Sequence, residues 1–516
     1  MLQTLLPEEM KALESDYMKA TGVPSILLME KAAQAVADAV ARHAPQSAAV
    51  LFLCGPGNNG GDGYAAARLW AERGGRAAIW ELSGSAHGDA DTERFLARQT
   101  GIPIRPVREE DTAESLCPAP FDAVVDALFG TGLSRPVEGA ARRLIGEVNR
   151  SGLPVVAVDI PSGLNGATGE ELGGVGGAVR AAETVPFHRP KPGLYLRQGC
   201  VCAGRVTVAP ILIPADWGAV EGLSVLEEKD LAQLIPDRAA DAHKGVFGRS
   251  VLFAGSTGMA GAAALCAMAC VRAGAGLTTV LCRRQVLPVV QTLCPGATCV
   301  PLPEAEAEAD HGSSRLLPEA ADMVRSVLRD ASRAAIGPGL GKDETLLPIL
   351  RAFREAECPV VWDADALNLL ALHGETATLL PLKPQDIVTP HPGEAAHLLG
   401  QDIPWVTGHP LEALRALHRR CGCAVILKGA RTLMTVDGER CAVNAVGAPA
   451  LAKGGSGDIL TGILAGLPRL PKGSAPRLED LQTAVLVHAL AGQRAAETCG
   501  VHSTAPEDVV RCIRVG

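Results

Sequence analysis

Short apolar runs that end in an aspartate or a glycine-rich turn recur along the chain, and they constrain its fold more than any other feature. The run from Pro154 to Asp159 is PVVAVD, and the run from Val360 to Asp363 is VVWD. Unbroken apolar runs of this length are typical of strands buried on both faces of a parallel sheet. The segments between these runs have the apolar spacing of helices, so the pattern predicts an α/β fold in which strands and helices alternate. The other strand candidates are 48–53, 121–126, 250–256, 277–281, 334–337, 387–389 and 424–428.

A gap in this pattern predicts two domains. The chain has 516 residues, and a typical size of about 100–200 residues per domain suggests two or three units. The first series of strands closes near Pro210–Pro214, and the second begins at Ser250. We therefore expect two doubly wound α/β domains, over 1–215 and 241–516, and a connecting segment with a short helix over 216–240.

Two further segments have a distinct composition. The spacing of apolar residues over 7–43 predicts two helices. Residues 304–310 are acidic and alanine-rich, and we expect them to form a surface loop. The apolar positions of the two helices are Met10, Leu13 and Tyr17, then Leu27, Leu28, Ala32, Val36 and Val40.

Charge, cysteine usage and hydropathy exclude several classes of protein. A net charge of −9 argues against a general nucleic-acid binder, which usually carries a basic face. The fifteen cysteines lack the spacing of a disulfide framework or zinc ribbon, so we expect reduced thiols. The start of the chain lacks a signal peptide, and the apolar stretch 260–271 is too short to span a bilayer. We expect a soluble, cytoplasmic homo-oligomer that acts on small molecules.

In the first half, polar side chains gather where three predicted strands end. The loop 55–63 reads GPGNNGGDG, and Asp126 and Asp159 end the next two strands. Successive glycines let backbone N–H groups approach an anion, whereas carboxylates, amides and a hydroxyl at one edge suit a hard cation or a general base. The loop matches neither the P-loop nor the dinucleotide-binding fingerprint. A tight strand-to-helix turn, with the aspartates as helix caps, is the structural alternative.

In the second half, the segment 452–462 is the most informative. It reads AKGGSGDILTG, so a Gly-Ser-Gly turn precedes a helix that begins near Asp458. Such a turn can present N–H groups to a transferring phosphoryl group, and Asp458 could accept a proton from an attacking hydroxyl. Alternatively, Asp458 only complements the helix dipole. Further turns at predicted strand ends are 255–262, 337–341, 363–368, 389–394 and 428–432.

These motifs, in this order, resemble two known families. The motif at 454–458 resembles the anion hole and catalytic base of ribokinase-like kinases, and the second half resembles their NAD(P)HX dehydratase branch. The first half resembles the NAD(P)HX epimerases. The resemblance covers about 5–509, as in the bifunctional nicotinamide nucleotide repair enzymes of bacteria. The segments that carry it are 28–30, 57–63, Asp126, 159–163, 243–248, 255–256, 337–339, 363–368, 389–394, 428–429 and 454–458.

The resemblance implies a Rossmann-like first domain and a ribokinase-like second domain with specific activities. The first would interconvert the R and S epimers of hydrated NADH and NADPH (NADHX and NADPHX). The second would use ADP with Mg²⁺ to phosphorylate the C6 hydroxyl of the S form, after which phosphate leaves. AMP, free phosphate and a restored nicotinamide ring would be the products.

The resemblance also implies roles for individual residues. Asp458 would be the general base of the dehydratase, and Asp159 would contact the hydrated ring in the epimerase. Potassium would be bound by Asn59, Asp126 and Ser162. The dinucleotide would be held in the first domain by Asn58, Asn59, Gly60, Gly61, Asp62, Gly130, Thr131, Gly132, Leu133, Ser134, Arg135 and Pro136. In the second domain, the hydrated dinucleotide would contact Ala262, Gly339, His391 and Asp458, and the nucleotide would contact Lys428, Gly429, Ala430, Arg431, Thr432 and Gly457.

Two alternatives stay open on the sequence. The second domain could be a ribokinase-like small-molecule kinase, such as a hydroxymethylpyrimidine or hydroxyethylthiazole kinase, which would retain the phosphoryl group on its product. The first domain could be a ligand-binding or scaffolding module in which Asp159 is structural.

Overall fold

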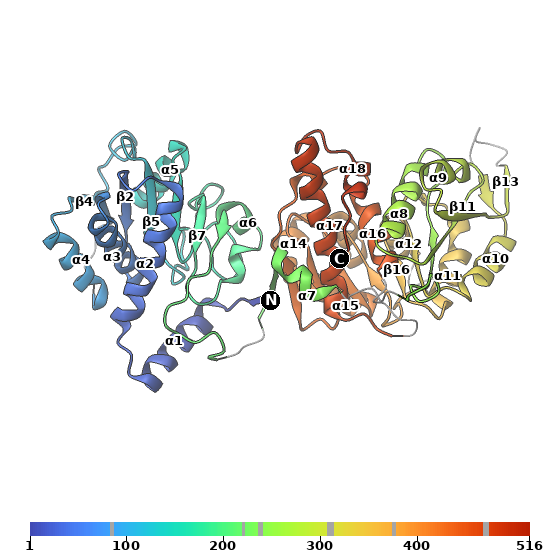
Figure 1. Cartoon of the computed structure of the whole chain (residues 1–516), viewed down its shortest axis with the longest axis horizontal. Helices are drawn as coiled ribbons and strands as arrows, with labels where there is room; N and C mark the ends of the chain where they lie inside the picture. The colour runs from blue at the N-terminus through green and yellow to red at the C-terminus, as the bar shows by residue number, and fades with distance from the viewer. Residues whose placement is uncertain are drawn as a thin grey trace. The chain divides into compact units, whose positions relative to one another are not determined.

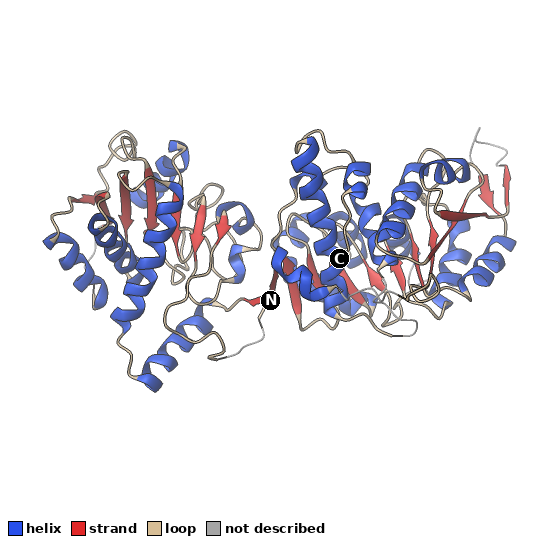
Figure 2. Cartoon of the chain, in the orientation of Figure 1, coloured by secondary structure: helices blue, strands red, loops and turns tan. Residues whose placement is uncertain are grey.

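The computed structural model describes residues 1–82, 87–218, 222–235, 241–306, 314–373, 378–467 and 474–515. The chain forms two compact units, Leu2–Leu223 and Ser224–Gly516, the latter together with Met1. Figure 1 labels many of the elements of both units, and Figure 2 colours the chain by secondary structure. The short strand β1 (Leu2–Gln3) precedes the first helix.

The first unit is built on a parallel sheet with helices on both faces. In its described part the strand order is β4-β3-β2-β5-β6-β7-β8, and every neighbouring pair is parallel. The strands are β2 (Ala49–Cys54), β3 (Arg76–Leu82), β4 (Ile104–Val107), β5 (Ala123–Ala127), β6 (Val155–Val158), β7 (Glu183–Val185) and β8 (Arg205–Val206). The helices are α1 (Pro7–Thr21), α2 (Ser25–His43), α3 (Asn58–Glu72), α4 (Asp89–Gln99), α5 (Gly139–Ser151) and α6 (Gly199–Cys202), with a 3₁₀ turn η1 (Pro192–Leu194).

Strand β2 shows why both faces are covered. Its successive side chains point to opposite faces, so Phe52 packs in a core with Val36 of α2, while Leu51 packs in another with Leu144 of α5. All of these side chains are fully buried. The predicted doubly wound arrangement is confirmed for this unit.

The second unit contains a longer, mixed sheet. Among the described residues from Ser224 onward the order is β9-β20-β19-β18-β17-β16-β15-β10-β11-β12, parallel except where β19 pairs with β18 and β20. The strands are β9 (Ser224–Leu226), β10 (Arg249–Phe253), β11 (Leu277–Cys282), β12 (Ala297–Pro301), β15 (Arg333–Ile336), β16 (Val360–Trp362), β17 (Ile387–Val388), β18 (Ala424–Leu427), β19 (Leu433–Thr435) and β20 (Cys441–Asn444).

Helices cover both faces of this sheet as well. Leu252 of β10 packs in a core with residues of α8 and α16, whereas the ring of the adjacent Phe253 stacks on Phe353 of α11 at 6.4 Å between centroids. The helices are α7 (Leu231–Leu234), α8 (Ala260–Arg272), α9 (Leu287–Leu293), α10 (Glu319–Leu328), α11 (Leu347–Glu355), α12 (Ala364–His373), α13 (Pro392–Leu399), α14 (Ile403–Gly408), α15 (Pro410–Cys421), α16 (Ser456–Gly466), α17 (Leu478–Cys499) and α18 (Pro506–Arg511). The 3₁₀ turns are η2 (Glu228–Asp230), η3 (Glu344–Leu346) and η4 (Pro449–Leu451).

The structure differs from the sequence predictions in four places. The segment 216–240 is more than a connection, because β9 pairs with β20 and α7 belongs to the same unit. Residues 304–306 form strand β13 (Glu304–Glu306), paired with β14 (Ser314–Leu316), rather than a loop; residues 307–310 lie outside the described residues. The side chain of Leu27 is exposed rather than on the buried face of α2. Finally, α3 begins at Asn58, inside the stretch 55–63 that was predicted as a loop.

The glycines explain the early start of α3. An ideal Cβ on Gly60 would lie 1.9 Å from the carbonyl oxygen of Gly55, and one on Gly61 would lie 2.7 Å from the terminal methyl of Met29. Only glycine allows the first turns of α3 to pack this closely, although glycine is intrinsically a poor helix former. No described helix combines the length and apolarity needed to cross a membrane.

Candidate functional site

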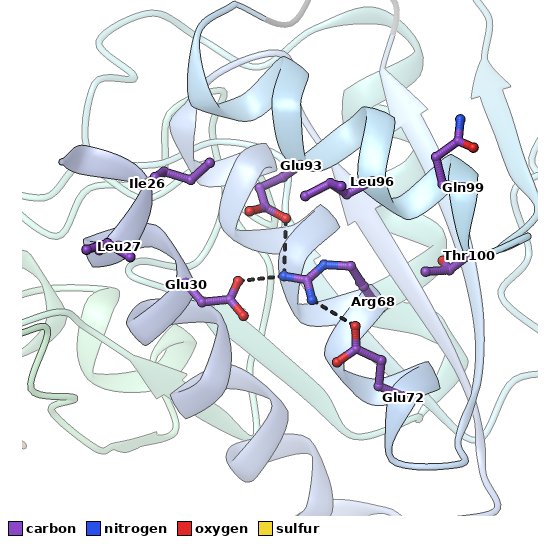
Figure 3. A pocket seen from close by; sticks show the side chains of 9 residues that line it. All are labelled: Ile26, Leu27, Glu30, Arg68, Glu72, Glu93, Leu96, Gln99 and Thr100. Carbon is purple, nitrogen blue, oxygen red and sulfur yellow. Dashed lines mark hydrogen bonds and ion pairs between the residues drawn. The ribbon is translucent and has the colours of Figure 1, made fainter.

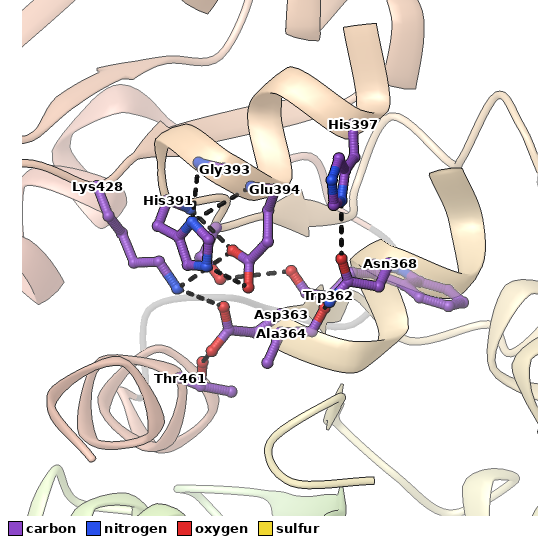
Figure 4. A network of polar contacts seen from close by, with 11 residues as sticks. Trp362, Asp363, Ala364, Asn368, His391, Gly393, Glu394, His397, Lys428 and Thr461 are labelled. Atoms are coloured by element: carbon purple, nitrogen blue, oxygen red, sulfur yellow. Dashed lines mark hydrogen bonds and ion pairs between the residues drawn. The ribbon is translucent and has the colours of Figure 1, made fainter. Parts of the chain in front are cut away.

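The second unit brings a lysine and an aspartate together at the carboxyl edge of its sheet. Asp363 follows β16 and Lys428 follows β18, with β17 between them. The Lys428 ammonium donates to Oδ1 of Asp363 at 2.7 Å, and the Thr461 hydroxyl of α16 donates to Oδ2 at 2.7 Å. Both carboxylate oxygens are therefore held, as Figure 4 shows.

The turn before α16 faces this pair. Gly455 has a φ of 94°, a backbone conformation that favours glycine. An ideal Cβ on Gly457 would lie 3.3 Å from Nζ of Lys428 and 3.8 Å from Oδ2 of Asp363. Because the first N–H groups of a helix lack intrahelical partners, the start of α16 and the Lys428 ammonium can bind the same anion.

Asp458 supplies an ionisable carboxyl group at the same place. Burial raises its pKa to about 7, as does the nearby Asp363 carboxylate, while Lys428 acts in the opposite direction. Asp365 and Glu394 raise it further. A carboxyl group with a pKa near neutrality is suited to accept a proton from a hydroxyl group and release it again.

His391 and Glu394 form a rigid cap at the start of α13. The His391 backbone N–H donates to Oε2 of Glu394 at 2.8 Å, and Nδ1 of His391 accepts from the backbone N–H groups of Gly393 and Glu394 at 3.0 and 3.2 Å. Nε2 lies 3.2 Å from Oε1 of Glu394, so the ring orientation is fixed. Oε2 of Glu394 is also 3.8 Å from Lys428, which links His391 to the Lys428–Asp363 pair.

Other predicted residues of the second unit fall into two groups. Ala262 and Gly339 are neighbours, because an ideal Cβ on Gly339 would lie 3.0 Å from the Ala262 methyl. The loop 428–432 starts at the site, but Arg431 turns its guanidinium to the backbone carbonyl of Ala445. Thr432 donates to the carbonyl of Gly429 at 3.3 Å, so it closes the loop upon itself.

Three residues of this site were not predicted from the sequence. Thr461 and Glu394 lie within predicted motifs, and the spacing of Thr461, four residues after Gly457 on one helix, could have indicated it. His488 lies on α17 and interacts with the backbone at Ser456, at the start of α16. Burial and Lys428 lower the pKa of His488 to about 4, and its buried Nε2 has no hydrogen-bond partner among the described residues. No local motif marks it.

The first unit gathers the predicted potassium ligands at its own carboxyl edge. The buried Asp126 carboxylate accepts from the backbone N–H of Ser162 at 2.7 Å, and the Ser162 hydroxyl accepts from the N–H of Phe129 at 2.8 Å. An ideal Cβ on Gly130 would lie 3.5 Å from Oδ1 of Asn59. Asn59 thus adjoins the loop that starts at Gly130, whose residues 131–136 are largely exposed.

Asp159 is paired with a lysine that sequence reasoning missed. The Lys191 ammonium donates to Oδ1 of Asp159 at 2.5 Å, and the Phe187 backbone N–H donates to the same oxygen at 3.3 Å. Lys191 is only 1% exposed, and Asp159 has a φ of 63°, unusual for a residue with a side chain. Asp62 of α3 is buried, and burial and the Asp159 carboxylate hold its pKa well above the usual range.

A cavity of about 510 Å³ lies elsewhere in the first unit, between α2, α3 and α4 (Figure 3). None of the predicted site residues lines it. Arg68 forms ion pairs there with Glu30 and Glu72 at 2.6 and 2.9 Å, and with Glu93 at 3.4 Å. Its guanidinium is thus already occupied by carboxylates and is a poor candidate for binding an anion.

Comparisons with known proteins match both units. A family model described as NAD(P)H-hydrate dehydratase matches residues 250–514, and one described as YjeF-related protein N-terminus matches residues 25–193. The bifunctional NAD(P)H-hydrate repair enzyme Nnr of Coxiella burnetii is 35% identical over 96% of this chain and 95% of its own length. The enzyme of the same name in Escherichia coli is 32% identical over 88% of this chain and 82% of its own.

Solved structures align with part of the chain. A ribokinase-like superfamily protein of Enterococcus faecalis is 27% identical, covering 57% of this chain and 95% of its own, with a TM-score of 0.48. The ADP/ATP-dependent NAD(P)H-hydrate dehydratase of Bacillus subtilis is 24% identical, covering 57% and 97%, with a TM-score of 0.46. The matches to both family models and the near full-length identity to curated relatives show that the chain belongs to the family of bifunctional NAD(P)H-hydrate repair enzymes.

Proposed function

We propose that this protein repairs hydrated NADH and NADPH, with an epimerase in the first unit and an ADP-dependent dehydratase in the second. The observation that carries the proposal is the position of Asp458, at the start of α16 and beside the Lys428–Asp363 pair. Burial raises the pKa of this carboxyl group to about 7. That arrangement joins a base to an anion site, as transfer of a phosphoryl group to a hydroxyl requires. The relatives that match both units carry the corresponding name.

In the dehydratase reaction, Asp458 takes the proton of the C6 hydroxyl of the S epimer. The freed oxygen attacks the β-phosphorus of ADP, and the bond to AMP breaks. Lys428 and the N–H groups around Gly457 stabilise the charge on the transferring group. The nitrogen lone pair of the ring then expels phosphate from C6, and loss of a proton from C5 restores the double bond.

The remaining predicted residues would bind the two substrates of this unit. Ala262, Gly339 and His391 would contact the hydrated dinucleotide, and Gly429, Ala430, Arg431 and Thr432 would contact the nucleotide. Mg²⁺ would enter with ADP and neutralise phosphate charge. The acidity around Asp458 fits such a cation, because the Asp363, Asp365 and Glu394 carboxyl groups all raise the pKa of Asp458, whereas the Lys428 ammonium lowers it.

In the first unit, Asp159 would contact the hydrated ring, and the segments 58–62 and 130–136 would hold the dinucleotide. Asn59, Asp126 and Ser162 would hold K⁺, which would fix the two segments next to each other. The donor set fits, because all three side chains offer oxygen and the Asp126 carboxylate is fully buried. Nδ2 of Asn59 is also buried and has no partner among the described residues, so this amide is not committed to another contact.

One assay tests the proposal. Purified protein is incubated with mixed-epimer NADHX and either ADP or ATP, and the absorbance of restored NADH is followed. Complete conversion with release of AMP and phosphate is expected with ADP, whereas conversion of the S epimer alone would show an inactive first unit. A stable phosphorylated product without NADH would favour the small-molecule kinase instead. Sedimentation would test the expected homo-oligomer, and fractionation of cells the expected cytoplasmic location.

A further inference from the structure

Glu14 lies on α1, before the residues 25–193 that the YjeF-related model matches. The start of α1 is held against the segment that carries Lys191. The Leu5 N–H donates to the carbonyl of Pro190 at 3.0 Å. An ideal Cβ on Gly166 would lie 2.9 Å from Cγ of Pro7 and 3.7 Å from Cγ of Lys191. Pro7 and Lys191 therefore pack around the same glycine.

The other end of α1 is also anchored. The hydroxyl of Tyr17 donates to the carbonyl of Leu212 at 2.9 Å, and its ring meets the ring of Trp217 edge-on at 5.2 Å between centroids. Leu13 and Tyr17 are buried on the inner face of the helix. The backbone at Glu14 is thus fixed from both sides.

Glu14 shares its surroundings with the Asp159–Lys191 pair. Burial raises the pKa of Glu14, the Lys191 ammonium opposes this shift, and the Asp159 carboxylate adds to it. The Asp62 carboxyl group is influenced by the same three residues. Among the described residues, Glu14 makes no side-chain hydrogen bond or ion pair of its own. The ammonium of Lys191 is already bound to Asp159. Glu14 lies seven residues, or about two helical turns, after Pro7, so it is on the side of α1 that packs beside Lys191. Glu14 is thus a carboxyl group with a raised pKa and no structural partner among the described residues.

The proposed epimerisation, on which this inference rests, needs such a group. C6 of the hydrated ring carries a hydroxyl group and is bonded to the ring nitrogen N1, so it is a hemiaminal carbon. Its configuration can invert if the C6–N1 bond opens to an aldehyde and closes on the other face. Opening requires a base for the hydroxyl proton and an acid for N1, and closing requires the reverse.

We propose that Glu14 is a catalytic acid–base residue of the epimerase, acting opposite the Asp159–Lys191 pair. The Asp159 carboxylate takes the hydroxyl proton, the C–O bond becomes a carbonyl, and the C6–N1 electron pair moves to N1. Glu14 gives its proton to N1. After rotation of the aldehyde, N1 attacks the other face, Glu14 takes its proton back, and Asp159 returns the proton to oxygen. No oxidant, reductant or further reactant is consumed.

Glu14→Gln in the full chain tests the inference. We expect the kcat of epimerisation, measured as R-to-S interconversion without ADP, to fall by about 10²–10⁴-fold, with a small change in KM. The matched control is Asp16→Asn, an exposed carboxylate on the same helix, and it should epimerise normally. Dehydration of pure S epimer with ADP should be unchanged in both variants, which shows that the second unit is intact, and the melting temperature of the first unit should match that of the wild type.

The pH profile and a second variant distinguish an acid–base role of Glu14 from a structural one. The wild-type rate should fall as pH rises past the raised pKa of Glu14, since the acid form is required, and Glu14→Gln should lack this limb. Asp62, Asp159 and Lys191 face the same place and are unchanged in the variant. Glu14→Asp should recover part of the rate. An unchanged rate in Glu14→Gln overturns the inference, whereas a wild-type protein without any epimerase activity overturns the proposed function itself.

Discussion

Nζ of Lys191 lies 2.5 Å from Asp159 in the first unit, and Nζ of Lys428 lies 2.7 Å from Asp363 in the second. Each aspartate follows a parallel strand, and each junction contains a non-glycine residue of positive φ, Asp159 itself in one and Ala364 in the other. The same ion pair thus stands at the carboxyl edge of two different sheets.

The neighbours of the two pairs differ. The second pair faces Gly457, whose missing side chain leaves room for a phosphoryl group at the start of a helix. The first pair faces the carboxyl groups of Glu14 and Asp62, whose raised pKa values suit them to exchange protons. Under the proposed roles, the ion pair would orient a substrate in both units, and its neighbours would determine the chemistry.

The largest effect is expected from Asp458→Asn. The dehydratase kcat should fall by about 10²–10⁴-fold, because the C6 hydroxyl loses its base. In the wild type, kcat/KM should rise with pH through about 7, since burial raises the pKa of Asp458 to about 7 and only the carboxylate accepts a proton. Epimerisation by the same protein is the internal control. Full dehydratase activity in this variant would show that the base lies elsewhere.

Lys191→Met and Lys428→Met test whether the two ion pairs contribute equally to the stability of their units. Lys191→Met should destabilise the first unit by about 3–5 kcal/mol, because it leaves a largely buried carboxylate without its cation. The loss from Lys428→Met should be smaller, since the Lys428 side chain is 18% exposed and Asp363 keeps its bond from Thr461. Denaturant unfolding measures both. Equal losses of unfolding free energy would contradict the expected difference between the two ion pairs.

Gly457→Ala tests the space beside the second pair. The added methyl would lie 3.3 Å from the Lys428 ammonium, where the transferring group is expected, so kcat should drop by about 10²-fold through misplacement. Gly454→Ala is the matched control, because a Cβ there meets nothing within 4 Å. Steady-state dehydratase kinetics measure both variants, and similar rates for the two would rule out a phosphoryl seat at Gly457.

The smallest expected effect concerns Asp126. Burial raises its pKa to about 6, above its unfolded value of about 3.9, so folding favours the protonated form. Stability from this group is present below about pH 4 and is lost as pH rises through 6, by at most about 3 kcal/mol. K⁺ bound to the carboxylate would reverse that loss.

Melting curves in KCl and in tetramethylammonium chloride measure this effect. Added K⁺ should stabilise the first unit more at pH 7.5 than at pH 5, and Asp126→Asn should remove the difference. Equal stabilisation at both pH values would mean that Asp126 is not a K⁺ ligand.

Much of the second site could be predicted from sequence. Asp363 and Lys428 end parallel strands, and such ends meet at one edge; Gly457 and Asp458 belong to a readable glycine turn. The pairing of Lys191 could not be predicted, because it lies beyond β7 in a loop whose depth depends on tertiary packing. His488 is hidden on a helix that is buried along most of its length.

The predicted start of α3 was wrong for a related reason. Gly60 and Gly61 have low helix propensity, which predicted a loop, but their close contacts with Gly55 and Met29 favour the helix. The two residues reveal their role only when the neighbouring segments are in place.

Strand β9 has a practical consequence for anyone who separates the two activities. A fragment that begins at residue 241 would lack β9 and leave the edge of β20, with its buried Val443, open to other chains. Exposed strand edges promote aggregation. A gene fragment for the dehydratase should therefore begin upstream of Ser224, and its solubility on expression would depend on those three strand residues.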